Sequence, residues 1–423
     1  VEAAVPNAAA KDDYYEMHEL FVETLDQIEQ NYMEKVSRRE LIEAAIRGMM
    51  SELDQYSDYV RPDEMDSLHR MIDNEFAGIG IRIGLSRGQV TVIAPMPDSP
   101  ALEAGLRAGD AILEIDGKST KGISLEDAMN LLKGEVGSEV NLAVRRASGR
   151  ETFTVRRDTI TMETVVGLYR NPDGSWEYFI DPDKKIAYIR VLSFGKQTAD
   201  ALRYALDRVT EDDARAVVLD LRFNPGGLVG AAIEICDMLI EDGRIVSVKG
   251  RNVPERAWDA KSRGTVDPLP MTVLVNHYTA SASEITSACL QDNGRVVVIG
   301  SRTWGKGVIQ NVVELEHGGS ALKLTTAEYY RPSGINIHRH PGDTDDDTWG
   351  VEPNQGFEIA TTGEDDIRIA ETFSRADRIP RNDQSTLTPD EILKNDAALK
   401  KGVEYLREKI EEAEKNQDKE ALE

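Results

Sequence analysis

The chain lacks a long apolar run, and it has few basic residues relative to its acidic ones. None of its 423 residues lies in a stretch approaching the ~20 apolar residues that a membrane helix needs, so we expect no membrane span. Lysine and arginine number 50 against 76 aspartates and glutamates, a formal net charge of −26. Nucleic acids and anionic membranes attract basic surfaces, so this balance argues against either as the main partner.

Cysteine and histidine are also scarce. Cys236 and Cys289 each fall within a helical pattern; a disulfide stays open, but two buried thiols are the simpler interpretation. His338 and His340 lie close to two aspartates, yet so short a polar cluster is more often solvated surface than a metal site. We therefore expect no metal and no cofactor. The sequence starts at Val1 with neither an initiator methionine nor a signal peptide, which predicts a processed or trimmed chain.

Helical periodicity marks both ends of the chain. Residues 11–36 carry apolar side chains at helical spacing, and a capping box from Ser37 to Glu40 opens a second helix. A similar box from Thr388 to Glu391 opens one terminal helix with an apolar stripe between Leu393 and Ile410. The two helical ends suggest a homodimer.

Between these ends, short strands give way to an alternation of strands and helices. Continuous apolar strands are predicted at residues 186–191, 216–221, 272–275 and 296–299. Such strands are buried on both faces of a sheet, and their alternation with helices favours an α/β core with a partly parallel sheet. The sequence thus predicts a multi-domain α/β (α+β) protein. Its parts are a helical segment, a compact strand-rich unit, the core and a helical extension, at residues 1–73, 74–160, 161–385 and 386–423.

Ser281 is the leading candidate nucleophile. It lies where a buried strand ends and a helix begins, and in α/β folds this position favours reactive groups because a helix N-terminus offers free N–H donors. Small residues on both sides would let a substrate backbone approach. The alternative is that Ser281 and Ser283 only cap the helix.

Lys306 is the leading candidate base. It stands between two glycines and near Trp304, and a lysine enclosed in such a turn can lose its proton at neutral pH. The run from Gly300 to Lys306 also nearly matches a phosphate-binding loop. Gly307 follows, however, where that motif requires serine or threonine for magnesium, so a nucleotide-dependent enzyme is only an alternative.

Two further groups bear on the same chemistry. Gly226 and Gly227 follow a buried strand and present backbone N–H groups without side-chain obstruction, which suits an oxyanion hole, although a plain turn is the alternative. His277, four residues before Ser281, is a second possible base. A His–Asp relay would need an aspartate that the sequence does not indicate.

Taken together, these motifs resemble those of the carboxyl-terminal processing peptidases, the tail-specific serine proteases of peptidase family S41. The resemblance lies in three runs in order: Asn224–Gly227, Thr279–Glu284, and Gly305–Gly307 with Gln310. It spans nearly the whole chain. Ile335 is a departure, because a basic residue usually stands there in the family, and this puts cleft specificity in doubt.

The resemblance implies a serine endopeptidase that works through an acyl-enzyme, with Ser281 as nucleophile and Lys306 as general base. Gln310, about one helical turn beyond the lysine, would orient it. The N–H groups of the oxyanion hole would come from Ala282 and Gly227, or from Gly226 in place of Gly227. The family also implies a periplasmic or other extracytoplasmic location, with attachment to the membrane through a removed N-terminal segment as an alternative.

The same resemblance makes residues 74–160 a PDZ domain, which would bind protein or peptide substrates by their terminal carboxylate. The carboxylate loop would be Gly78, Ile79, Gly80 and Ile81. Leu125, Ala128 and Leu132 would line the pocket for the last side chain. A non-catalytic PDZ scaffold is the rival from another class, and it predicts peptide binding without turnover.

Overall fold

A computed structural model describes residues 8–65, 68, 75–96, 98–146, 148–380 and 387–420. The chain divides into two compact units. One comprises residues 1–68 and 309–326, and the other comprises residues 69–308 and 327–423. No helix in these described ranges is long and apolar enough to cross a membrane.

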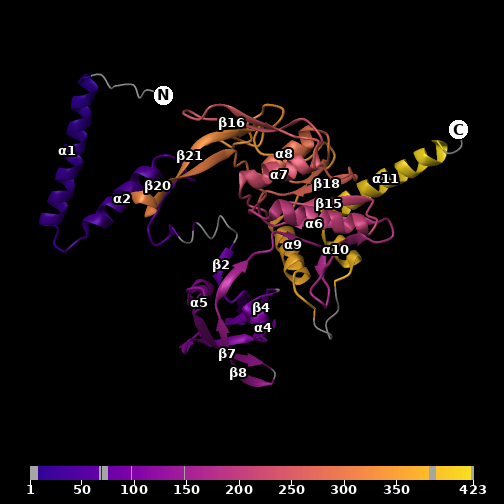
Figure 1. Cartoon of the computed structure of the whole chain (residues 1–423), viewed down its shortest axis with the longest axis horizontal. Helices are drawn as coiled ribbons and strands as arrows, with labels where there is room; N and C mark the ends of the chain where they lie inside the picture. The colour runs from indigo at the N-terminus through magenta and orange to yellow at the C-terminus, as the bar shows by residue number, and fades with distance from the viewer. Residues whose placement is uncertain are drawn as a thin grey trace. The chain divides into compact units, whose positions relative to one another are not determined.

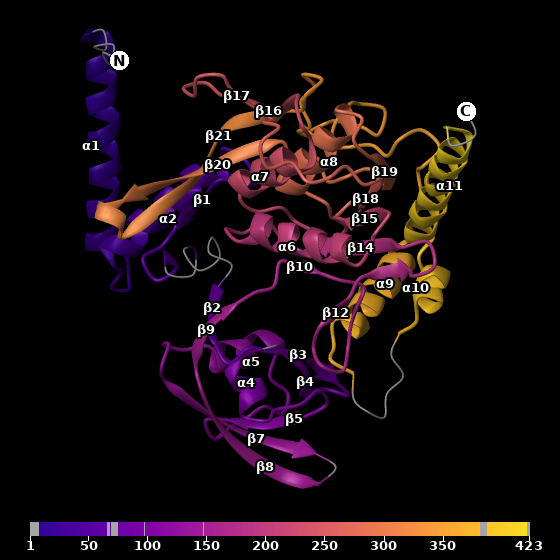
Figure 2. The same ribbon diagram turned by 45° about the vertical axis from the view of Figure 1, so that its right-hand side comes forward.

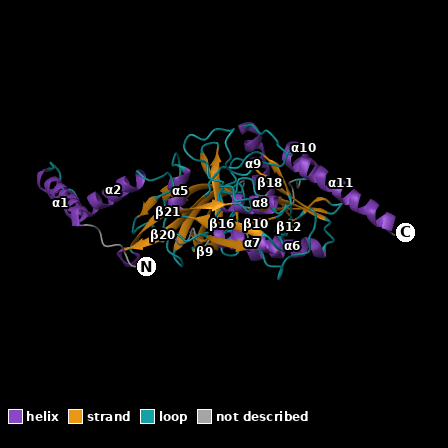
Figure 3. Ribbon diagram, turned by 90° about the horizontal axis from the view of Figure 1, so that it is seen from above, coloured by secondary structure: helices purple, strands orange, loops and turns teal. Residues whose placement is uncertain are grey.

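The first unit consists of helices and short strands. Helices α1 (Ala8–Asn31) and α2 (Arg38–Ser51) are joined by a short loop (Figure 3), and Ser37 caps α2 as predicted. Strand β1 (Asp58–Val60) pairs antiparallel with the start of β21 (Ser320–Tyr330). Strand β20 (Val308–Leu315) also pairs with β21, across the short 3-10 turn η1 (Glu316–Gly318). The sequence prediction places this hairpin in the core at residues 161–385, whereas residues 309–326 belong to the same compact unit as the N-terminal helices.

The second unit begins with a small antiparallel sheet. Its elements are β2 (Glu75–Gly78), β3 (Ile81–Ser86), β4 (Gln89–Pro95), α4 (Pro100–Glu103), β5 (Ala111–Ile115), β6 (Lys118–Ser119), α5 (Leu125–Leu132), β7 (Glu139–Arg146), β8 (Gly149–Arg156) and β9 (Asp158–Thr161). The sheet order is β3-β4-β5-β7-β8, with β6 beside β5, while β2 pairs with β9. Strand β3 is therefore an edge strand, and an edge offers unpaired N–H and C=O groups to an added peptide.

The core of the second unit is a six-stranded sheet. Its elements are β10 (Val165–Val166), β13 (Phe179–Asp181), β14 (Ile186–Val191), α6 (Thr198–Glu211), β15 (Ala216–Asp220), α7 (Val229–Leu239), β18 (Met271–Val275), α8 (Ala282–Asp292), β19 (Val297–Gly300) and α11 (Ala397–Glu420). The order is β10-β14-β15-β18-β19, and the sixth strand, β13, also pairs with β14. Strands β14, β15, β18 and β19 run parallel. Helices α6, α7 and α8 lie on one side of the sheet and α11 on the other (Figure 1; Figure 2). Cover on both faces explains the continuous apolar strands, and the mixed fold class is as predicted.

Smaller elements complete this unit. They are β11 (Tyr169–Arg170), β12 (Trp176–Glu177), β16 (Arg244–Lys249), β17 (Arg256–Asp259), α9 (Gly363–Ala376) and α10 (Pro389–Asn395). Strands β11 and β12 form a hairpin, and β16 pairs with β17 and with the end of β21. Cys236 and Cys289 are buried free thiols, which confirms the simpler of the two interpretations.

The single terminal helix predicted from the sequence is wrong, because the chain breaks at Asp396 between α10 and α11. The carboxylate of Asp396 accepts the N–H of Leu399 in the first turn of α11. It also pairs with the buried guanidinium of Arg222, at 2.8 and 2.7 Å, and Arg222 binds Asp220 at the end of β15. A buried ionic partner far away in the sequence thus sets the break, while the apolar stripe continues on both sides of it.

Candidate active site

The carboxyl ends of three adjacent parallel strands bring the predicted motifs together. Residues 222–227 follow β15, residues 276–281 follow β18, and residues 301–306 follow β19. In an open α/β sheet, this edge is where loops converge and where sites form. The sheet order therefore assembles segments that lie far apart in the chain.

Hydrogen bonds join these three loops. The N–H of Ala280 donates to the carbonyl of Asn224 at 3.0 Å, and the N–H of Trp304 donates to the carbonyl of Thr279 at 2.9 Å. The Ser283 hydroxyl also donates to the carbonyl of Asn224, at 3.1 Å. Ser283 thus ties α8 to the glycine loop and does not have the capping role considered from the sequence.

Ser281 occupies the N-cap position of α8 in an unusual backbone conformation. Its φ of 59° and ψ of −117° are rarely adopted by a residue with a side chain, and such strain often marks functional positions. Its side chain interacts with the phenol of Tyr329. Burial raises the pKa of Tyr329, so this hydroxyl stays protonated. The sequence offered no signal for Tyr329, since only the pairing of β21 brings it to the site.

The carboxylate of Glu284 is fully buried and accepts four hydrogen bonds. Oε2 accepts the backbone N–H of Ser281 and that of Lys306, both at 2.8 Å. Oε1 accepts the Thr303 hydroxyl at 2.5 Å and the N–H of Gly305 at 2.7 Å. Burial raises the pKa of Glu284, and these hydrogen bonds act in the opposite direction.

Lys306 lies in a loop between β19 and β20, because β20 begins at Val308. A phosphate-binding loop leads into a helix whose N–H groups hold the phosphate. Here a strand follows the lysine, so the structure does not support the nucleotide-binding alternative.

The turn at Lys306 is packed by a different segment from the one expected. Trp304, predicted to enclose the lysine, is half exposed. A Cβ on Gly305 would lie 2.8 Å from the Cβ of Arg339, and a Cβ on Gly307 would lie 2.3 Å from the N of His338. Glycine is required at both positions because the loop through residues 338 and 339 lies directly against this turn.

The two glycines after β15 have different roles. A Cβ on Gly226 would lie 2.8 Å from the Cβ of Ser281, so only glycine allows this close approach. The N–H of Gly226 donates to Asn224 Oδ1 at 2.9 Å, which corrects the prediction that it could serve in an oxyanion hole. Within the described residues, no acceptor is recorded for the N–H of Gly227 or of Ala282, and these two remain the candidates.

His277 has the acidic partner that the sequence did not indicate. Its Nε2 lies 3.5 Å from Oδ2 of Asp366, on α9. The imidazole is half exposed and contacts the ring of Tyr278, with centroids 4.0 Å apart and the planes tilted by 42°. In the described part of the chain no recorded contact joins His277 to Ser281, so the pair does not form a relay to the nucleophile.

Gln310 lies in strand β20, which corrects the expectation of a helical turn after the lysine. Its side-chain amide donates to the carbonyl of Tyr56 within the first unit. An orienting role toward Lys306 stays a prediction.

A groove of about 450 Å³ opens beside β3. The predicted carboxylate loop and Leu132 are part of its lining: Gly78, Ile79, Gly80, Ile81 and Leu132. Leu125 and Ala128 do not line it, which corrects the predicted pocket. On α5, Ala128 is buried in the domain core, while Met129 and Lys133 border the groove.

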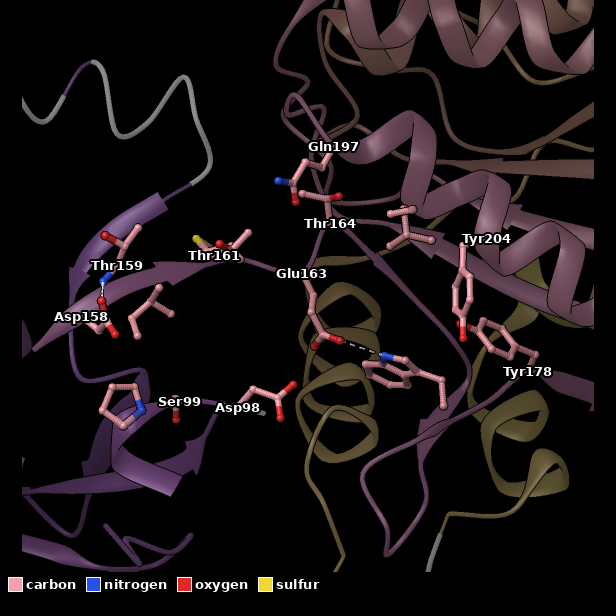
Figure 4. Close-up of a pocket in the computed structure, with 16 residues that line it drawn as sticks. Asp98, Ser99, Asp158, Thr159, Thr161, Glu163, Thr164, Tyr178, Gln197 and Tyr204 are labelled. Atoms are coloured by element: carbon pink, nitrogen blue, oxygen red, sulfur yellow. Dashed lines mark hydrogen bonds between the residues drawn. The ribbon is translucent and has the colours of Figure 1, made fainter. Parts of the chain in front are cut away.

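A second pocket, of about 540 Å³, lies along the linker that follows β9. Figure 4 shows Asp98, Asp158 and Glu163 around it, with Glu163 accepting the indole N–H of Trp176 at 3.3 Å. None of the three motif loops contributes to its lining. Among the described residues, no three or more His, Cys, Asp or Glu side chains are grouped so that they could hold a metal.

Comparison with known proteins places the chain among proteases. Residues 185–355 match Peptidase family S41, residues 91–146 match the PDZ domain, and residues 3–64 match the activating protease CtpB N-terminal domain. The carboxy-terminal-processing protease of Bartonella bacilliformis is 34% identical over 324 residues, covering 75% of this chain and 71% of that protein. The carboxyl-terminal-processing protease of a Picosynechococcus species is 36% identical over 300 residues, 70% of each chain. Among solved structures, a photosystem II D1 C-terminal processing protease is 29% identical, with a TM-score of 0.45, covering 80% of this chain and 92% of that one.

Proposed function

Because the chain belongs to peptidase family S41 and to its carboxy-terminal processing serine proteases, we propose that Ser281 and Lys306 are its catalytic pair. One observation carries the proposal: the backbone N–H groups of both residues donate to the same oxygen of Glu284, each at 2.8 Å. The backbones of Ser281 and Lys306 therefore lie close together, on either side of one carboxylate oxygen.

In the proposed reaction, the Ser281 hydroxyl attacks the scissile carbonyl while its proton passes to the neutral amine of Lys306. The negative charge that develops on the carbonyl oxygen is met by the N–H groups of Gly227 and Ala282. Lys306 then returns the proton to the leaving amine, which departs and leaves an ester on Ser281. Water hydrolyses the ester, with Lys306 acting as base again.

We propose that the PDZ domain selects substrates by their C-termini. The peptide would add as a strand along the free edge of β3, with its carboxylate at the N–H groups of Gly78, Ile79 and Gly80. The last side chain would enter the groove beside Leu132 and Met129. Unstructured polypeptides that end in apolar residues are the substrates to test first. Peptide binding without any turnover would instead support the scaffold alternative.

Amidation of a substrate's C-terminus is expected to lower kcat/KM about tenfold or more, because a hydrogen-bonded charge is worth roughly 1.5–3 kcal/mol. Two peptides that differ only in this group, each assayed well below KM, give the measurement. Equal rates for the acid and the amide would show that the carboxylate loop does not select substrates.

A homodimer is part of the proposal, with α1 in the interface. Several large apolar side chains on this helix are exposed: Tyr14, Tyr15, Met17, Leu20 and Phe21. A second copy would present the same face and cover them symmetrically. Sedimentation velocity tests this, because removal of residues 1–36 should convert a dimer into a monomer. An intact chain that sediments as a monomer would contradict it.

An extracytoplasmic location is also proposed, and it rests on the family resemblance alone. Fractionation of cells that express the full gene, followed by immunodetection, tests it. Recovery of the protein only in the cytoplasmic fraction would contradict it.

A further inference from the structure

Glu284 makes more contacts than a helix cap requires. It stands at the third position of α8, where a glutamate or glutamine commonly accepts the N–H of the N-cap residue. Its bond to the N–H of Ser281 is of this kind. That role uses one acceptor site on one oxygen and explains one of the four hydrogen bonds.

The other three donors come from the loop that carries Lys306. They are the Thr303 hydroxyl, the N–H of Gly305 and the N–H of Lys306 itself. Thr303 is fixed in turn, because its Oγ1 accepts the N–H of Val351 at 2.7 Å. The carboxylate thus connects the start of α8, which follows β18, to the loop that follows β19. Strands β18 and β19 are neighbours in the sheet.

The chemistry of the site requires a carboxylate. Glu284 has no exposed surface, and a buried carboxylate without hydrogen-bond donors is costly. Four donors converge on two oxygens, and each oxygen accepts two of them. An amide has only one acceptor oxygen, and its NH₂ group would face two donors in either orientation.

We propose that Glu284 is a positioning residue that holds the nucleophile and the base in alignment. This inference rests on the proposed function of Ser281 and Lys306. Glu284 acts through the backbone of both residues. If an NH₂ group replaces Oε1, Oε2 still accepts the N–H groups of Ser281 and Lys306, so α8 stays capped. The NH₂ group would then face the N–H of Gly305 and the Thr303 hydroxyl, and the loop that carries Lys306 would shift away from it.

The test is Glu284→Gln, which can still cap the helix. We expect kcat per active site to fall about 100-fold, the loss that a misplacement near 1 Å produces. Active sites are counted by letting an irreversible serine-directed phosphonylating reagent react to completion. The dissociation constant of a labelled C-terminal peptide should stay within about twofold, because the PDZ domain is far along the chain from Glu284. A purely structural role would lower the number of active sites without changing the rate at each one.

Glu391→Gln is the matched control. Glu391 is the third residue of α10, and its Oε2 accepts the N–H and the hydroxyl of its N-cap Thr388, at 2.9 and 3.1 Å. The same substitution is thus made in a capping box whose carboxylate, among the described residues, accepts hydrogen bonds from the cap alone. It should leave kcat unchanged. If Glu284→Gln does not fold, Thr303→Val replaces it; this variant removes one donor to Oε1 and should lower kcat about tenfold.

Three outcomes separate the possibilities. A Glu284→Gln enzyme with near wild-type kcat would overturn the positioning role while the catalytic pair stands, provided that Ser281→Ala is inactive. An active Ser281→Ala would refute the proposed function itself. If only Thr303→Val can be measured, an unchanged kcat overturns the positioning role.

Discussion

Ser281→Ala is expected to abolish proteolysis, with kcat/KM reduced by at least ~10⁴-fold, as when other serine proteases lose their nucleophile. Ser283→Ala should keep most of the activity. Its hydroxyl donates to the carbonyl of Asn224, and that carbonyl still accepts the N–H of Ala280 after the change. The loss is then one net hydrogen bond, about 1 kcal/mol of stability. Cleavage of an unstructured polypeptide with an apolar C-terminus is the assay.

The two serines serve as controls for each other, since both lie at the start of α8 and both substitutions remove one hydroxyl. The reverse pattern, with Ser283→Ala inactive and Ser281→Ala active, would shift the nucleophile by two residues. It would also leave the strained backbone of Ser281 without a function.

Lys306→Arg is expected to be as inactive as Lys306→Ala, at least ~10³-fold below wild type, within the range of general-base catalysis. A guanidinium keeps the positive charge but cannot give up its proton in the working range of pH. The backbone N–H that donates to Glu284 is unaffected by the substitution. The variant should therefore fold, which circular dichroism measures, and should bind C-terminal peptides with unchanged affinity.

Substantial activity in Lys306→Arg would mean that the residue supplies only a charge. His277 would then become the next candidate base, because Asp366 lies 3.5 Å from its ring. Loss of activity in His277→Ala alongside an active Lys306→Arg would establish that alternative.

Much of the core could be predicted because its strands and helices have strong local patterns. The apolar runs that became β14, β15, β18 and β19 lie within one residue of the predicted positions. The break at Asp396 could not be found in this way, because its cause is the buried Arg222, which is distant in the sequence. Helical spacing alone continues through that break.

In the candidate active site, too, some residues could be predicted from local motifs and others depend on contacts between distant segments. The family motifs name Ser281 and Lys306, and the sheet order brings their loops together. The contact of Tyr329 with Ser281 depends on the pairing of β21, which no motif indicates. The use of the Gly226 N–H by Asn224 likewise depends on the folded shape of the loop. The groove is lined by Met129 and Lys133 of the α5 segment beside Leu132, and helical spacing alone does not determine which side of the helix faces the groove.

Mass spectrometry of a trapped acyl-enzyme tests the catalytic pair most directly. Wild-type protein is mixed with excess substrate, quenched in acid before steady state, and digested. The peptide that contains Ser281 should carry the mass of the acyl part of the substrate, and Lys306→Arg should show no such adduct. An adduct on a different residue would contradict the assignment of Ser281 as the nucleophile.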